Sequence, residues 1–112
     1  MPRDTSDLLH GTLDVLILKT LGWGPMHGYA ISAWIEQRTD RELEIVDAAL
    51  YKALHRLEAT GPIDAERGLS RANRRAKYYS LTRKGRQQLR SAMATWKRDA
   101  TAVTAVLETK SA

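Results

Sequence analysis

The stretch VDAALYKALHRLEATGPIDAERGLSRANRRAKYYSL, residues 46–81, decides the fold of this chain. Its first part carries apolar residues every three or four positions, which predicts an amphipathic helix with one buried stripe made of Val46, Leu50, Leu54 and Leu57. Gly61-Pro62 ends that helix, because proline cannot continue it and glycine tolerates a left-handed exit. Two short strands are then expected, at residues 63–66 and 77–81, joined by a turn.

The turn between these strands is strongly basic. From residue 67 to residue 77 it contains no acidic residue and five cationic ones, Arg67, Arg71, Arg74, Arg75 and Lys77. Like charges at one hairpin tip repel each other, so the pattern favours a polyanionic partner. A helix followed by a basic hairpin is typical of a winged helix-turn-helix, in which the helix enters the DNA major groove and the hairpin, called the wing, lies on the backbone or in the minor groove. The simpler alternative is a solvated basic loop.

Length and composition limit the classes of protein to which this chain can belong. The chain has 112 residues, which suffice for one domain with a modest core. It has no cysteine, which excludes disulfides and thiolate metal sites. No apolar run approaches the roughly 20 residues of a membrane span, and no signal-peptide pattern begins the chain, so a cytoplasmic location is expected. The sequence shows no acid–base cluster, nucleophile motif or phosphate loop, so no enzyme activity, cofactor or metal site is predicted.

The net charge of +5 is distributed unevenly along the chain. Residues 1–47 hold four Lys/Arg and eight Asp/Glu, a net charge of −4, whereas residues 48–112 hold fourteen and five, a net charge of +9. An acidic half and a basic half indicate that one face of the molecule meets a polyanion.

Three further helices are expected outside this stretch. A leucine-rich helix spans residues 8–21 and starts only at Thr12 if Gly11 weakens it, and a second helix spans residues 26–39. Residues 43–45 are a plausible short strand that could pair with the wing. A last helix follows the N-cap residue Thr82 and runs to residue 108.

The last helix carries a heptad seam. Its apolar residues are spaced alternately by four and three positions, at Leu89, Met93, Trp96, Ala100, Val103 and Leu107. At about 1.5 Å per residue the helix is about 40 Å long, more than a small winged-helix core can cover. Its distal part is therefore expected to pack on a second chain, although a helix folded onto its own domain is the alternative.

These patterns predict a mainly α fold with a small β wing (α+β), that is, a winged helix-turn-helix with a long C-terminal dimerisation helix. Residues 1–81 form the DNA-binding domain, residues 82–108 form the dimerisation helix packed on the N-terminal helix, and residues 109–112 form a disordered tail. The predicted dimer interface consists of Leu9, Leu13, Leu16, Leu89, Met93, Trp96, Val103 and Leu107.

Three blocks of sequence resemble the PadR family of bacterial transcriptional regulators. They are Leu9–Leu21 with GPMHGY at residues 24–29, LYKALHRLE at residues 50–58, and NRRAKYYSLT at residues 73–82 followed by Gly85. The resemblance covers about residues 8–108, and the long last helix suits the shorter subfamily. It implies a homodimeric winged-helix repressor that binds a palindromic operator on double-stranded DNA and is often released by a small molecule.

The resemblance also implies which residues meet DNA. The helix at residues 46–60 would be the recognition helix, and Tyr78 could donate its hydroxyl to a phosphate, whereas Tyr79 belongs to the core. His27 and Tyr29 are expected to position the second helix. The full predicted DNA-binding set is Ala48, Ala49, Tyr51, Lys52, His55, Arg71, Asn73, Arg74, Arg75, Lys77 and Tyr78.

Four residues depart from the family pattern. Ala49 replaces a usual Ser or Thr, and Lys52 replaces a common proline and adds a charge that could reach a phosphate or a guanine. Pro62 and Arg67 stand where bulky apolar residues are frequent, so the first wing strand is expected to be short or irregular.

A ligand site is expected at the dimer seam, because smaller members of this family sandwich flat aromatic compounds between paired tryptophans. Trp96 would stack on the ligand, Met93 would adapt to its shape, and Val15 and Ala100 would line the walls. The alternative is that Trp96 only fills the interface.

Two other functions remain open on the sequence alone. One is a nucleic-acid-binding module that has no sequence preference or ligand response. The other is a winged helix that uses its basic tip on an acidic protein partner.

Overall fold

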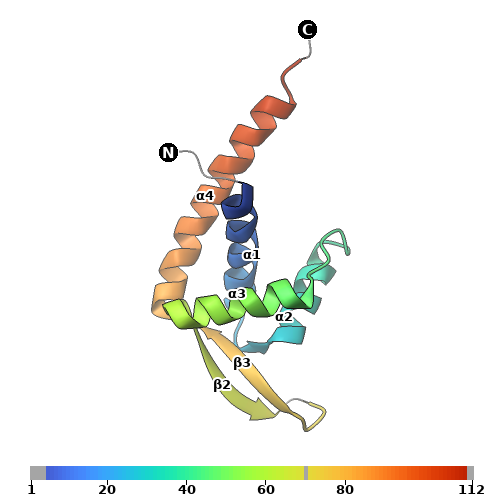
Figure 1. Cartoon of the computed structure of the whole chain (residues 1–112), viewed down its shortest axis with the longest axis vertical. Coiled ribbons are helices and arrows are strands. Elements are labelled where there is room, and N and C mark those ends of the chain that lie inside the picture. The colour runs from blue at the N-terminus through green and yellow to red at the C-terminus, as the bar shows by residue number, and fades with distance from the viewer. Residues whose placement is uncertain (1–4, 70, 111–112) are drawn as a thin grey trace.

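The computed structural model describes residues 5–69 and 71–110, apart from the side chains of residues 5–10. The elements along the chain are α1 (Thr5–Leu21), β1 (Met26–His27), α2 (Gly28–Arg38), α3 (Asp47–Thr60), β2 (Ile63–Leu69), β3 (Arg75–Leu81) and α4 (Arg83–Leu107). Figure 1 shows α1, α2 and α3 grouped in the middle, the β2–β3 hairpin extending from one side, and α4 running past α1 away from the hairpin. The predicted mainly helical fold with a small β wing is confirmed.

The core lies where the first three helices meet the sheet. Its buried residues are Ile17, Leu18, Leu21, Ile31, Ile35, Leu50, Ala53, Leu54, Leu57, Ile63 and Tyr79. The predicted stripe on α3 is correct except at Val46, which is the N-cap residue and is 67% exposed. Ala53 lies on the buried face of α3 instead. Helix α1 continues through Gly11, so the expected start at Thr12 is wrong. Asp14 of α1 accepts a hydrogen bond from Arg56, which ties α1 to α3.

The third strand of the sheet is not the one that was predicted. The strand order is β1-β3-β2, and β1 pairs Met26 with Tyr79 and His27 with Tyr78. Helix α2 therefore begins at Gly28 instead of Met26, and the Nδ1 atom of His27 caps it by accepting the Ala30 N–H at 3.1 Å.

Residues 43–45 are not a strand, because side chains satisfy their backbone groups instead of a neighbouring strand. The hydroxyl oxygen of Thr39 accepts the Leu43 N–H at 3.2 Å, and the Glu36 carboxylate accepts the Ile45 N–H at 3.2 Å. Asp40 and Arg41, with φ values of 50° and 64°, turn the chain between α2 and this segment.

The wing is longer and more regular than expected. Strands β2 and β3 have seven residues each and pair without interruption from Ile63 opposite Leu81 to Leu69 opposite Arg75. The expected irregular first strand is wrong, because Pro62 precedes the strand and Arg67 takes a regular place opposite Lys77. The Gly61 N–H donates to the Leu57 carbonyl at 3.1 Å with φ at 104°, a left-handed exit of the kind that favours glycine.

Helix α4 is fixed to the corner between α3 and β2. The Thr82 hydroxyl accepts the Gly85 N–H at 3.0 Å and donates to the Gly61 carbonyl at 2.7 Å, which confirms Thr82 as the N-cap. Gly85 is buried against Pro62, and a Cβ atom at Gly85 would lie only 2.1 Å from the Pro62 carbonyl oxygen. The start of α4 is therefore held close to the wing.

Beyond this anchor α4 packs on α1, and from residue 101 to residue 110 every side chain is exposed. Thr109 still contacts the end of α4: its backbone N–H donates to the Val106 carbonyl at 3.2 Å and its hydroxyl donates to the Ala105 carbonyl at 2.7 Å. The disordered tail at residues 109–112 stays a prediction. Residues 111–112 lie outside the described residues. Within the described part of the chain, no helix has the length and apolar character to cross a membrane.

Candidate nucleic-acid interface

Helix α3 presents a continuous exposed face opposite its buried stripe. The five residues predicted to meet DNA on this helix all lie on that face, namely Ala48, Ala49, Tyr51, Lys52 and His55. The two alanines leave the N-terminal half of the face shallow, so a nucleic-acid groove can approach the helix backbone closely. Lys52 and His55 supply polar groups one turn further along.

The hairpin extends away from the three helices (Figure 1), and Arg71 and Arg74 lie in the turn between β2 and β3. Arg71, Arg74 and Arg75 are exposed, as is Asn73, whose φ of 58° makes the left-handed turn between the strands. Asparagine adopts this conformation more readily than most residues. The arrangement gives the hairpin tip a concentrated positive charge, as the sequence predicted.

Lys77 has an internal partner. Its Nζ atom lies 2.8 Å from the Glu58 carboxylate of α3 and 5.6 Å from the centre of the Tyr79 ring. The hydrogen bond with Glu58 raises the pKa of the Lys77 ammonium. Lys77 therefore links the wing to α3, and its predicted contact with a DNA phosphate stays a prediction.

Tyr78 and Tyr79 point to opposite faces of β3, as alternation along a strand requires. Tyr79 is 5% exposed and belongs to the core, as predicted, and burial raises the pKa of its phenol. The Tyr78 hydroxyl donates to the Leu69 carbonyl across the hairpin at 2.9 Å. This hydrogen bond links β3 to β2, and the donation of the Tyr78 hydroxyl to a phosphate stays a prediction.

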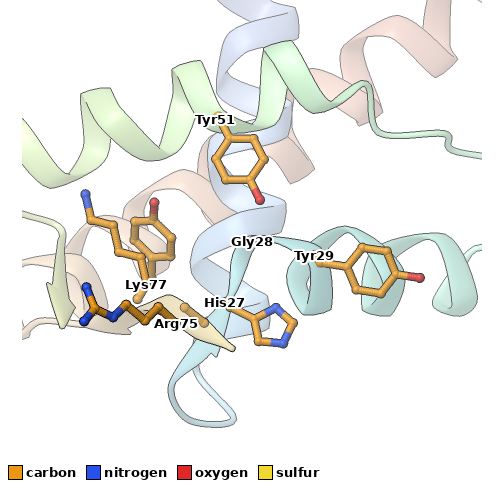
Figure 2. A pocket seen from close by; sticks show the side chains of 8 residues that line it. His27, Gly28, Tyr29, Tyr51, Arg75 and Lys77 are labelled. Carbon is orange, nitrogen blue, oxygen red and sulfur yellow. The ribbon is translucent and has the colours of Figure 1, made fainter. Parts of the chain in front are cut away.

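A cavity of about 290 Å³ opens between α2, α3 and the wing (Figure 2). Figure 2 shows Tyr51 reaching from α3 toward Gly28 at the start of α2, while Arg75 and Lys77 come from the wing and Tyr29 points away. The lining residues are His27, Gly28, Tyr29, Tyr51, Arg75, Ala76, Lys77 and Tyr79. The sequence predicts only that His27 and Tyr29 position α2, and it gives no signal for Gly28, because nothing local in the sequence shows that Tyr51 lies over Gly28.

The outer part of α4 carries apolar side chains that its own protomer does not cover. Trp96 is 45% exposed, Val103 48%, Val106 74% and Leu107 78%. Val106 is not among the predicted interface residues, since it lies beside the heptad seam and not on it. Met93 and Ala100 are half-buried on the same helix.

The other predicted interface residues lie deeper in the protomer. Leu13, Leu16 and Leu89 are half-buried and pack against its core. Val15, which was predicted to line the ligand site, is only 8% exposed. The side chain of Leu9 lies outside the described residues. Among the described side chains, those of residues 11–69 and 71–110, no group of three or more His, Asp or Glu is placed to hold a metal ion.

The exposed face of α3, the basic wing that follows it and the capped α2 before it together define a winged helix-turn-helix DNA-binding protein. Comparison with known proteins agrees. Residues 17–91 match the model of the transcriptional regulator PadR-like family, so the chain belongs to the PadR family. It is a DNA-binding transcriptional regulator and not an enzyme.

Individual relatives support this assignment over most of the chain. An uncharacterised protein from Lysinibacillus sphaericus is 34% identical over 91 residues, which cover 81% of this chain and 84% of the relative. The crystal structure of a PadR family transcriptional regulator from Eggerthella lenta is 32% identical, with a TM-score of 0.74 over 93% of this chain and 88% of that one. A transcriptional regulator from Clostridium thermocellum is 30% identical, with a TM-score of 0.78 over 91% and 96%.

Proposed function

We propose that this chain is a homodimeric repressor that binds a palindromic operator and is released by a small aromatic ligand. Residues 1–81 serve as the DNA-binding domain and residues 82–108 as the dimerisation helix. The observation that carries the proposal is that one small chain joins a DNA-facing surface, formed by α3 and the wing, to a long helix with uncovered apolar side chains.

The DNA contacts divide into two kinds. In the major groove, Lys52 and His55 contact base edges or phosphates, and the small side chains of Ala48 and Ala49 allow close approach and contact with thymine methyl groups. At the wing, Arg71, Asn73, Arg74 and Arg75 hold phosphates or enter the minor groove. The first kind sets which sequence is bound, and the second supplies most of the salt-dependent affinity.

The dimer rests on the surface of α4. Val103, Val106 and Leu107 expose apolar area where only solvent surrounds the single chain, and such a patch indicates a protein interface. A second copy of α4, related by a two-fold axis, covers this patch with an identical one. Leu13 and Leu16 of α1, together with Leu89, Met93 and Trp96 of α4, extend the interface toward the DNA-binding domain.

The ligand site lies where the two copies of Trp96 approach each other. The indole offers a broad apolar face that stacks on planar rings and attracts cations. Met93 and Ala100 are half-buried beside it, and Val15 of α1 closes the back wall from within the protomer. A ligand held between the protomers changes their relative orientation and hence the spacing of the two α3 helices.

A repression assay in cells tests the proposal. A reporter promoter carries the operator obtained by selection from random DNA, and expression is measured with the wild-type protein and with Lys52→Ala. Repression by the wild type that Lys52→Ala weakens, and that a bound planar ligand relieves, supports the proposal. Unchanged or raised expression with the wild type would contradict a repressor.

A further inference from the structure

The cavity between α2, α3 and the wing has a chemical character that suits one particular occupant. Its donors come from three elements that meet only in the folded domain: the Tyr51 hydroxyl from α3, the Arg75 guanidinium from β3, and the start of α2. We propose that this cavity holds one phosphodiester of the DNA backbone, and that Gly28 is the residue that positions Tyr51 to bind it. The inference rests on the proposed DNA contacts of α3 and the wing and names a specific site within them.

Strand alternation explains why cations face this cavity. Arg75 and Lys77 share strand parity with Tyr79, whose buried ring defines the side of β3 that faces the helices. Both cations therefore extend along the rim of the core toward α3, and both line the cavity.

Their charges are not equally available. Glu58 compensates Lys77 at 2.8 Å, whereas Arg75 has no ion-pair partner within the described part of the chain. Arg75 is accordingly the cation that meets the phosphate, and its planar group is suited to binding two phosphate oxygens.

Tyr51 is held over the cavity by the absence of a side chain at Gly28. A Cβ atom at residue 28 would lie 2.6 Å from the Tyr51 hydroxyl oxygen and 2.8 Å from two of its ring carbons. Only glycine at this position leaves the space that the phenol occupies. The Tyr51 hydroxyl therefore faces the cavity between α2, α3 and the wing, and not the base edges (Figure 2). Its predicted role accordingly changes from a contact in the groove to a contact with a phosphate.

The start of α2 adds to the positive character of the same site. The first backbone N–H groups of a helix lack intrahelical acceptors. His27 Nδ1 accepts the Ala30 N–H, and Gly28, the first residue of α2, lines the cavity. A phosphodiester accepts hydrogen bonds and carries one negative charge, and an unmodified base offers no such anion.

The test combines protein variants with DNA in which single phosphates are neutral. Anisotropy titrations use the full-length protein, the selected operator, and operators with one methylphosphonate per half-site at successive positions. For the wild type, neutralising the contacted phosphate should weaken binding about tenfold, because a charge-assisted contact is lost in each half-site. In Arg75→Gln the same methylphosphonate should cost about twofold or less, since the cationic partner of that phosphate is already gone. In Tyr51→Phe it should cost less than in the wild type, since one of the two partners of that phosphate is gone.

Two further variants separate a loss of Tyr51 positioning from a loss of folding. Gly28→Ala should weaken binding to the unmodified operator about tenfold, but add much less to Tyr51→Phe, because the hydroxyl it displaces is then absent. Tyr29→Phe removes the same kind of hydroxyl from a ring that points away from the cavity, and should bind like the wild type. Circular dichroism melting confirms which variants are folded, and Tyr51→Phe remains informative if Gly28→Ala does not fold.

The results distinguish the site from the general function. A first outcome is that the wild type binds the operator while every methylphosphonate reduces the affinity of Tyr51→Phe and Arg75→Gln by the same factor as that of the wild type. In that case the cavity holds no phosphate and the inference is overturned. The same follows if Tyr29→Phe loses as much affinity as Tyr51→Phe. Failure of the wild type to bind any selected sequence would instead overturn the proposed function itself.

Discussion

Replacing Gly85 by alanine should destabilise the protein through a single close contact. The added Cβ would lie 2.1 Å from the Pro62 carbonyl oxygen, 2.7 Å from a methyl carbon of Leu81 and 3.0 Å from the Pro62 carbonyl carbon. Two of these three neighbours are backbone atoms, which cannot rotate away. The start of α4 must therefore move by roughly 1 Å relative to the corner between α3 and β2 to reach an ordinary contact distance.

The loss in free energy of unfolding follows from the contacts that this movement disturbs. Overpacking of this kind costs about 1–3 kcal/mol, and weakening the Thr82 cap on the Gly85 N–H adds about 1 kcal/mol. Alanine regains up to about 1 kcal/mol over glycine inside a helix. With the full regain, the expected net loss is about 1–3 kcal/mol. With a urea m-value of about 2 kcal/mol/M, the unfolding midpoint should fall by about 0.5–1.5 M.

Gly11→Ala is the matched control, because Gly11 lies inside α1 and a Cβ there would meet nothing within 4 Å in the protomer. Its midpoint should stay at the wild-type value or rise by up to about 0.5 M. All proteins are compared at one protomer concentration, because dimer formation makes stability concentration-dependent. A Gly85→Ala midpoint equal to or above that of the wild type would show that the close approach of α4 to Pro62 is wrong.

Three further outcomes are expected. Val103→Glu combined with Leu107→Glu would bury unpaired charge at the dimer seam, so the molecular mass measured by light scattering should fall from twice 12.6 kDa toward 12.6 kDa. An unchanged dimer would place the interface elsewhere. The pKa of the Tyr79 phenol is raised in the folded protein, so the unfolded chain loses this proton at a lower pH than the folded chain. The ammonium of Lys77 also has a raised pKa, and its link to Glu58 is lost as the pH rises through that pKa. The urea midpoint should therefore fall above about pH 10. Tyr79→Phe should reduce that alkaline fall, and an equal fall in both proteins would assign it to other groups. A planar cationic dye such as Hoechst should bind the wild type saturably but not Trp96→Ala, while equal binding by both would leave Trp96 as packing.

The sequence predicted the helices and the hairpin because each has a strong local signal. The apolar spacing of α3, the Gly-Pro stop and the Thr82 cap are short-range features, and all three are present in the structure. Strand β1 has only two residues, too few to show any periodicity, so its pairing with β3 could not be predicted. The residues chosen in its place, 43–45, have strand-like composition, but Thr39 and Glu36 accept their backbone N–H groups.

The candidate site was predicted in composition but not in its internal contacts. Exposure of Lys52, His55 and the wing arginines follows from helix periodicity and charge. The pairing of Lys77 with Glu58, the Tyr78 hydrogen bond and the contact of Tyr51 with Gly28 each join separate elements. Such contacts depend on how α3, the wing and α2 pack together, and no local pattern encodes that packing.

Selection of bound sequences from a random DNA pool tests the central claim most directly. A two-fold dimer that places α3 and a wing on each half-site should enrich an inverted repeat, with half-site centres about one helical turn, or roughly 34 Å, apart. Enrichment of a single unrepeated motif, or recovery of no preferred sequence at all, would contradict a dimeric regulator of a palindromic operator.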